Sequence, residues 1–246
     1  MTRARLVIWH TNDLHGRLSQ RAAERLRQLR ETTPGSLLLD AGDALAAGNL
    51  FWRRKEPVLE RMRLAGYDAM CLGNREFHLW QIGFASKLRD CPHPVLCANL
   101  KSGSRPLPPR VQPDLVIETA FGLRLGLIGL TVPMVTRSMA AARLSHYLFE
   151  NPVQAAKREV ATLRAQCQMI IALSHLGLKR DRELVQHVPE IDLVIGAHSH
   201  TPLNQPEQHA GRYIVQSVPY AKAVGRLELE IASDKVALIG GELVAL

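Results

Sequence analysis

Short apolar runs alternate along this chain with stretches in which apolar residues recur every three or four positions. The short runs predict buried β-strands, and the helical period predicts amphipathic helices. Strands are predicted near residues 5–10, 36–40, 69–72, 94–97, 115–119, 124–130, 168–174 and 191–196, and helices at roughly 17–31, 55–66, 79–90, 152–166 and 179–188. Later strands near 213–217, 223–231 and 235–243 have no helices between them. This order predicts an α/β fold, a four-layer αββα sandwich of two mixed β-sheets with helices outside.

Polar side chains with metal-binding chemistry follow five of the predicted strands. His198 and His200 come two residues apart after the strand near 191–196, and Asp13 and His15 have the same spacing after the first strand. Residues two apart in extended chain face the same side. The carboxyl ends of parallel strands in an α/β sheet border a common crevice, so we expect these side chains to converge. The candidate metal ligands are Asp13, His15, Asp43, Asn74, His175, His198 and His200.

Seven donors exceed what one ion uses, because a single transition ion takes about four to six ligands. Two ions about 3.5–4 Å apart, sharing one bridging ligand, would use all seven. Mixed imidazole and carboxylate donors suit Mn²⁺, Fe²⁺, Co²⁺ or Zn²⁺. Taken singly, His175 is also consistent with a structural side chain, and Asp43 with a residue that caps a turn. The joint spacing favours the metal interpretation.

The order of these motifs resembles that of the calcineurin-like metallophosphoesterases, and within them the 5′-nucleotidase type. The motifs that carry the resemblance are DLH at 13–15, GD at 42–43, GNRE at 73–76, the lone His175 and GAHSH at 196–200. The closer likeness to the nucleotidase type rests on HTND at 10–13, LLLDAGD at 37–43, AGYDA at 65–69, ANL at 98–100, IGLT at 128–131 and ALSHLG at 172–177. Five motifs in one order are not expected by chance.

The resemblance implies which residues share each ion. One ion would be held by Asp13, His15 and His200, the other by Asn74, His175 and His198, and Asp43 would bridge both. The resemblance further implies a hydrolase, a binuclear metallophosphoesterase acting through a metal-bridging hydroxide. Its substrates would be phosphate esters or pyrophosphate-type bonds of nucleotides or related small phosphorylated molecules. Mn²⁺ is the favoured metal.

One motif departs from the family pattern at the position of the catalytic residue. Arg75 stands where the resemblance places a catalytic His, and His78 replaces the acidic residue that pairs with that His in the nucleotidase branch. A guanidinium with a pKa above ~12 keeps its proton at ordinary pH, but it can bind a phosphate oxygen by charge-assisted hydrogen bonds. We therefore expect Asn74 and Arg75 to bind the substrate phosphate, and Arg75 and His78 to be the residues that determine catalysis.

Two alternatives follow from the replacement of the family's catalytic His and its acidic partner by Arg75 and His78. His78, one helical turn after Arg75, could act as the acid in place of the missing His. The chain could instead be a metal-dependent phosphate- or nucleotide-binding protein with little or no turnover, because the catalytic pair is lost.

Length and charge limit the other functions. The 246 residues, of which 46% are hydrophobic, fit a single metallophosphoesterase domain over 1–246, without the C-terminal base-binding domain that nucleotidase relatives usually carry. The formal charge is +8, but the arginines of residues 17–30 lie mostly off the apolar face of a predicted helix. Aromatic content is 5%, and no basic patch is interleaved with aromatic residues. We therefore expect a small phosphorylated substrate and no nucleic acid.

The cysteines and the N-terminus bear on location. Cys71, Cys91, Cys97 and Cys167 lack C-x-x-C spacing and are predicted to be reduced core thiols of a cytoplasmic protein. The apolar run after the basic residues 1–5 is too short for a signal peptide or a membrane span. No membrane association is expected, and the sequence leaves the oligomeric state open.

Overall fold

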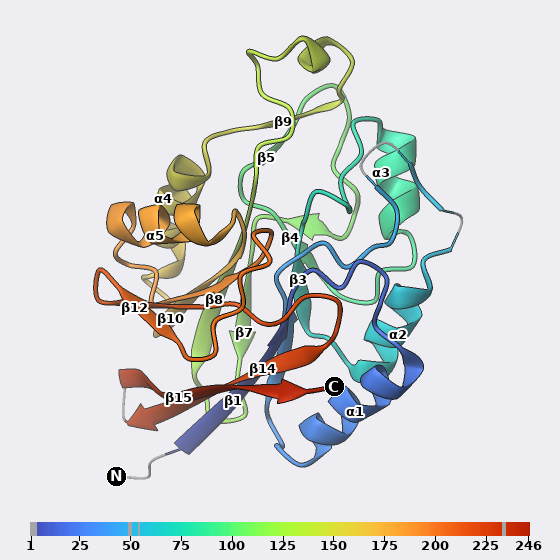
Figure 1. The fold of residues 1–246 in the computed structure, drawn as a ribbon. Helices are drawn as coiled ribbons and strands as arrows, with labels where there is room; N and C mark the ends of the chain where they lie inside the picture. The colour runs from blue at the N-terminus through green and yellow to red at the C-terminus, as the bar shows by residue number, and fades with distance from the viewer. Residues whose placement is uncertain (1–3, 49–50, 54, 233–234) are drawn as a thin grey trace.

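Two mixed β-sheets pack face to face in the computed structural model, which describes residues 4–48, 51–53, 55–232 and 235–246 (Figure 1). The seven-stranded sheet contains, in spatial order, β15 (Lys235–Ala245), β14 (Ala223–Ala232), β1 (Ala4–Thr11), β2 (Leu37–Asp40), β3 (Ala69–Cys71), β4 (Val95–Leu96) and β6 (Val111–Gln112). The six-stranded sheet contains β12 (Glu207–His209), β13 (Arg212–Val215), β11 (Leu193–Gly196), β10 (Met169–His175), β8 (Arg124–Thr131) and β7 (Asp114–Glu118). A separate antiparallel pair is formed by β5 (Leu100–Ser102) and β9 (Tyr147–Phe149).

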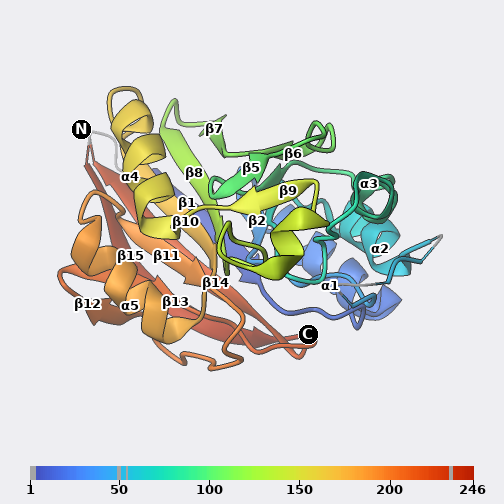
Figure 2. The same cartoon turned by 90° about the horizontal axis from the view of Figure 1, so that it is seen from above.

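Helices cover the outer face of each sheet (Figure 2). The seven-stranded sheet is covered by α1 (Gln20–Glu31), α2 (Pro57–Ala65) and α3 (Gln81–Leu88), and the six-stranded sheet by α4 (Pro152–Leu163) and α5 (Leu178–His187). A short 3₁₀ helix, η1 (Ala140–Arg143), precedes β9.

Neighbouring residues of one strand enter different cores. In β1, Ile8 packs in the core between the sheets, whereas Trp9 packs in the core beneath α1, α2 and α3. In β10, Ile171 lies between the sheets, whereas Ile170 and Ala172 pack in the core beneath α4 and α5. This alternation follows from the two-residue period of a strand and gives four layers around three cores. The predicted α/β fold of two mixed sheets with helices outside is confirmed.

Element boundaries differ from the predicted ones where a local hydrogen bond decides them. The helix predicted from residue 17 begins at Gln20, because the Ser19 hydroxyl accepts a hydrogen bond from Ala22 N (3.0 Å) and caps the first turn. At α4, Asn151 caps the first turn and Pro152 occupies the first helical position. Four short strands, β5, β6, β9 and β12, were not predicted, although the equally short β3 and β4 were.

The four cysteines are buried, and none forms a disulfide, so their prediction as core thiols is confirmed. Within the described part of the chain, the helices are too short or too polar to cross a bilayer. The expectation for the basic N-terminal segment concerns residues 1–3, which lie outside the described residues. The cytoplasmic location and the single domain over residues 1–246 stay predictions.

Candidate metal centre

The candidate ligands follow the carboxyl ends of strands from both sheets. Strands β1, β2 and β3 are parallel neighbours in one sheet, and β10 and β11 are parallel neighbours in the other. The loops after these strands meet at one edge of the sandwich, as expected for parallel strands. They carry Asp13, His15, Asp43 and Asn74 from the first sheet and His198 and His200 from the second, where His175 ends β10 itself.

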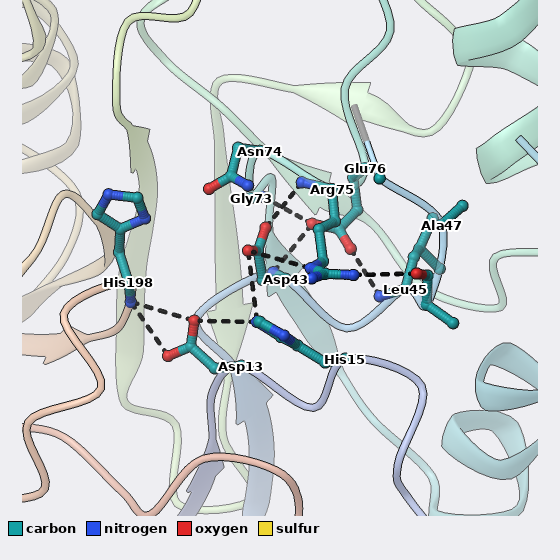
Figure 3. A network of polar contacts seen from close by, with 12 residues as sticks. Asp13, His15, Asp43, Leu45, Ala47, Gly73, Asn74, Arg75, Glu76 and His198 are labelled. Carbon is teal, nitrogen blue, oxygen red and sulfur yellow. Dashed lines mark hydrogen bonds and ion pairs between the residues drawn. The ribbon is translucent and has the colours of Figure 1, made fainter. Parts of the chain in front are cut away.

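The Asp43 carboxylate lies between donors from the two sheets. Its Oδ2 is 3.5 Å from His15 Nε2 (Figure 3), and its Oδ1 is 3.4 Å from His175 Nε2. Each carboxylate oxygen thus faces an imidazole that comes from a different sheet. This is the position that a ligand bridging two ions would occupy.

Asp13, His15 and His200 form a first group of donors. Asp13 Oδ1 lies 3.7 Å from His15 Nε2 and 3.3 Å from His200 Nε2. The two imidazole rings are 5.1 Å apart. The ligand atoms of these three residues all lie within 4.8 Å of one another, a spacing that one ion can span.

Asn74, His175 and His198 form the second group. His175 Nε2 is 3.2 Å from Asn74 Oδ1, and the His175 ring is 5.0 Å from the His198 ring. His175 Nδ1–H donates to Ala41 O (3.0 Å), so the lone pair of Nε2 faces Asn74 Oδ1 and Asp43 Oδ1 once the ring has lost its second proton, as it must to bind a metal. Three electron-pair donors then face one point, and a cation is what stabilises such an arrangement.

The electrostatics of the centre favour positive charge. Burial raises the pKa of Asp43, but the charge of His175 and hydrogen bonds from His15 and His175 outweigh it and hold the pKa well below its usual range. Burial lowers the pKa of His175, yet the Asp43 and Asp13 carboxylates raise it to about 9. His15 Nε2 is buried between two carboxylates, and no described residue forms a hydrogen bond with it. These donors fit divalent metal ions.

Five of the seven candidate ligands have left-handed backbone, which residues other than glycine rarely adopt. They are Asp13 (φ 51°), His15 (φ 49°), Asp43 (φ 59°), His198 (φ 72°) and His200 (φ 51°). Backbone hydrogen bonds hold the first two loops together, from Asp13 N to Gly42 O (2.9 Å) and from His15 N to Asp43 O (2.9 Å). Such a concentration of unusual backbone is typical of functional sites that the surrounding fold keeps rigid.

Glu76 joins the loop of Asp43 to the loop that carries Asn74 (Figure 3). Its fully buried carboxylate accepts hydrogen bonds from Asp43 N (2.9 Å), Gly73 N (2.8 Å) and Leu45 N (2.9 Å). Gly73 approaches so closely that an added Cβ would lie 2.2 Å from Asp43 N. Only glycine fits there, which explains the Gly-Asn order of the motif.

Replacing Glu76 by Gln is expected to lower the free energy of unfolding by about 1–3 kcal/mol, because an amide turns an N–H₂ group toward a backbone donor. Urea unfolding followed by circular dichroism would measure the loss. Glu60→Gln, on the exposed face of α2, is the matched control and should change little. Equal stability of both variants would contradict the positioning role of Glu76.

Arg75 lies beside the donors. Its Nε is 3.8 Å from Asp43 Oδ2, its backbone N–H donates to Asp43 Oδ1 (2.8 Å), and Nη1 donates to Ala46 O (2.9 Å). The side chain is 30% exposed. The structure therefore brings Arg75 together with the seven candidate ligands.

His78 has a different setting. Its ring is buried, Nδ1 accepts a hydrogen bond from Trp80 N (3.0 Å), and the ring packs against the indoles of Trp52 and Trp80. These contacts hold the ring in an aromatic cluster close to α3. A role for His78 as a general acid stays a prediction.

Two residues that support the centre were missed in the sequence. Tyr220 Oη lies 3.3 Å from His200 Nδ1, and its ring packs edge-on against the rings of His15 and His200. Asn12 Nδ2 donates to Asp13 Oδ2 (2.9 Å), and its Oδ1 accepts from Ser217 N (2.8 Å). Asn12 lies within the HTND motif at 10–13, which was a signal in the sequence, whereas Tyr220 carried none.

Comparison with known proteins agrees with this geometry. The family model described as calcineurin-like phosphoesterase matches residues 6–202. The 5′-nucleotidase of Rattus norvegicus is 32% identical over 272 residues, covering 92% of this chain and 46% of that protein. The chain thus spans about half the length of the curated relatives it matches.

Solved structures show the same fold. The 5′-nucleotidase precursor of Thermus thermophilus superposes with a TM-score of 0.81 at 25% identity, over 98% of this chain and 55% of that one. The NAD nucleotidase of Haemophilus influenzae gives a TM-score of 0.81 at 22% identity, over 99% and 57% of the two chains. The motif order, the two-sheet fold and the matched family model lead to one conclusion: this chain belongs to the calcineurin-like phosphoesterase family.

Proposed function

We propose that this chain is a binuclear, metal-dependent phosphoesterase that hydrolyses phosphate esters or pyrophosphate-type bonds of small molecules such as nucleotides. The observation that carries the proposal is the Asp43 carboxylate, whose two oxygens lie 3.5 Å and 3.4 Å from imidazoles of different sheets. The similarity to 5′-nucleotidases supports the choice of substrate class.

The seven donors would divide between two ions. Asp13, His15 and His200 would hold one, Asn74, His175 and His198 the other, and Asp43 would contact both. When bound, two ions of this kind supply a water molecule of lowered pKa, neutralise phosphate charge and align the substrate for in-line displacement. Imidazole, carboxylate and amide donors suit Mn²⁺, Fe²⁺, Co²⁺ or Zn²⁺, with Mn²⁺ favoured.

Arg75 would bind the phosphate without acting as an acid. Its guanidinium stands next to Asp43, where a phosphate held at the centre would meet it, and can form one or two charge-assisted hydrogen bonds to the phosphate oxygens. The same group keeps its proton at ordinary pH, so it gives no help to a basic leaving group. Asn74, on the same loop, would contact both the ion and the phosphate.

The leaving group should therefore decide the rate. A sugar alkoxide needs a proton as the ester bond breaks, whereas a phenolate or a phosphate does not. General acid catalysis typically contributes ~10²–10⁴-fold, and this contribution would be missing for alkyl esters. Aryl phosphates and pyrophosphate linkages are the substrates that this centre is best suited to cleave.

Arg75 and His78 stand in place of the catalytic pair of the family pattern. This difference also supports a second candidate, a metal-dependent phosphate- or nucleotide-binding protein with little or no turnover. Arg75 would serve such a protein as well as it serves an enzyme, because binding requires no proton transfer. The His78 ring, whose Nδ1 accepts from Trp80 N, packs among aromatic side chains. The two candidates differ only in turnover.

Steady-state hydrolysis of 4-nitrophenyl phosphate separates them. We expect turnover with Mn²⁺, loss of turnover after treatment with a chelator, and recovery when Mn²⁺ is restored. Activity that survives complete removal of metal would contradict the proposed function. Binding of inorganic phosphate to the Mn²⁺-loaded protein, with no turnover under any of the four metals, would establish the binding protein instead.

A further inference from the structure

Large apolar side chains are exposed on two segments near the loop of Arg75. Trp52 is 43% exposed and Trp80 is 50% exposed, and Phe51 and Ile82 beside them are exposed further. Indole rings normally bury most of their surface, and a contiguous exposed apolar patch on a soluble domain usually marks a binding site. The two tryptophans come from different segments, one following the Asp43 loop and the other following the Arg75 loop.

His78 joins the two indoles. Its ring centroid lies 5.0 Å from the ring of Trp52, at an interplanar angle of 89°, and 5.6 Å from the ring of Trp80, at 58°. Both distances are in the range of favourable aromatic contacts. The His78 ring itself is only 2% exposed, and Trp80 N–H donates to its Nδ1 (3.0 Å). A buried imidazole thus supports two partly exposed indoles.

Lys87 fastens this aromatic cluster to the loop of Arg75. Its Nζ donates to Gly48 O (2.8 Å), Arg75 O (2.6 Å) and Phe77 O (2.9 Å). The side chain is almost completely buried, and burial lowers the pKa of its ammonium group to about 8. The three carbonyls belong to the segment that leads to Trp52 and to the segment that leads to His78. The ammonium group therefore holds both segments against each other.

Arg75 adds a second link between the same segments. Its Nη1 donates to Ala46 O (2.9 Å), and Glu56 accepts hydrogen bonds from Ala46 N (3.3 Å) and Ala47 N (3.1 Å). Arg75 and His78 are three residues apart, so their Cα atoms are separated by at most about 11 Å. A phosphate at Arg75 and a planar group attached to it can span a distance of this order.

We propose that Trp52 and Trp80, supported by His78, form a stacking surface for a planar aromatic leaving group of the substrate whose phosphate Arg75 binds. The inference rests on the proposed function and specifies its substrate class. Stacking on an indole requires only a π-face, so it tolerates different rings, from a phenyl group to a nucleobase. A ring joined directly to the ester oxygen leaves as a phenolate and departs without an acid, whereas a nucleoside leaves as an alkoxide.

Two phosphonates that cannot be hydrolysed test the surface without turnover. Calorimetric titration of the Mn²⁺-loaded protein should give an affinity for phenylphosphonate about tenfold higher than for methylphosphonate. The ratio of phenylphosphonate affinity to methylphosphonate affinity should fall to a value of about 1–3 in Trp52→Leu and in Trp80→Leu. Trp52→Phe should retain most of the tenfold ratio because an aromatic ring remains. Phe121→Leu, at an exposed aromatic residue between β7 and β8, is the matched control and should keep the full ratio.

A second experiment distinguishes a nucleobase from a ring attached directly to the phosphate. AMP and ribose 5-phosphate are compared as competitors of 4-nitrophenyl phosphate in the unmodified protein. Stronger competition by AMP, lost in Trp52→Leu, would identify a nucleobase as the group that stacks. Equal competition, together with the phenylphosphonate preference, would identify a ring attached directly to the phosphate. Melting temperatures of the variants exclude an effect of misfolding.

Other outcomes would overturn the inference. Equal affinity of the unmodified protein for both phosphonates would contradict the stacking surface. The phosphoesterase proposal would stand, because methylphosphonate would still bind. An equal loss in Phe121→Leu would also overturn it. If neither phosphonate binds the Mn²⁺-loaded protein, the proposed function fails and the stacking surface fails with it.

Discussion

Replacing Asp43 by Asn is expected to reduce Mn²⁺-dependent hydrolysis of 4-nitrophenyl phosphate by at least about a thousandfold. Asp43 lies between His15 and His175, and an amide in its place offers one oxygen without charge where two charged oxygens face two groups of donors. Both ions would lose a shared ligand, so affinity for metal should fall together with the rate. Initial rates over a range of Mn²⁺ concentrations would measure both effects.

Asp90→Asn is the control for this variant, because Asp90 is exposed just after α3 and lies outside the groups of donors. Its rate should stay within about twofold of the unmodified protein, as expected for a surface substitution. A loss below tenfold in Asp43→Asn, at saturating Mn²⁺, would contradict the bridging position of this carboxylate.

The double replacement Arg75→His with His78→Asp is expected to increase hydrolysis of alkyl phosphate esters by up to ~10²–10⁴-fold. It recreates the acid and its partner that the family pattern places at these positions, so a basic alkoxide could leave with a proton. Aryl esters should change much less, because a phenolate leaves unaided. Parallel rate measurements on an alkyl and an aryl phosphate of similar size give the comparison.

The single replacement Arg75→His is the control for the pair. Without a carboxylate partner its imidazole should be less well oriented, so its gain should be smaller than that of the double variant. Equal rates on alkyl and aryl esters in the unmodified protein would contradict the account of Arg75 and would make His78 the first candidate for an acid.

The long elements of this fold could be predicted because their residues carry the period themselves. In β10, Ile170 and Ile171 are both apolar because each faces a buried core, one against helices and the other against the second sheet. Such continuous apolar runs are typical of strands covered on both faces. The short strand β9 could not be predicted, because its pairing with β5 depends on residues nearly fifty positions earlier in the chain.

The convergence of the candidate ligands could be predicted because strand ends and donor chemistry are local features of the sequence. The structure places Asp13, Asp43 and His175 together although they come from three different strands, as their shared edge of the sandwich requires. The support of these ligands was out of reach of the sequence. Ser217 N donates to Asn12 across 205 positions of the chain, and such a contact leaves no local pattern.

The packing of His78 against aromatic side chains could not be predicted from the sequence either. The sequence placed His78 three residues after Arg75 and left open a role as an acid, but it gave no sign that the ring packs against Trp52 from another loop. The ammonium group of Lys87 donates to carbonyls of both loops. A buried lysine in an amphipathic helix gives no sign in the sequence that it donates to three carbonyls.

If the seven donors hold two ions, the metal content of the protein should show it. The protein is stripped with a chelator, loaded with Mn²⁺, freed of excess metal by gel filtration and measured by inductively coupled plasma mass spectrometry against its concentration. We expect close to two Mn²⁺ per chain, since Asp43 faces donors of both groups. A content of one ion per chain, or of none, would contradict it.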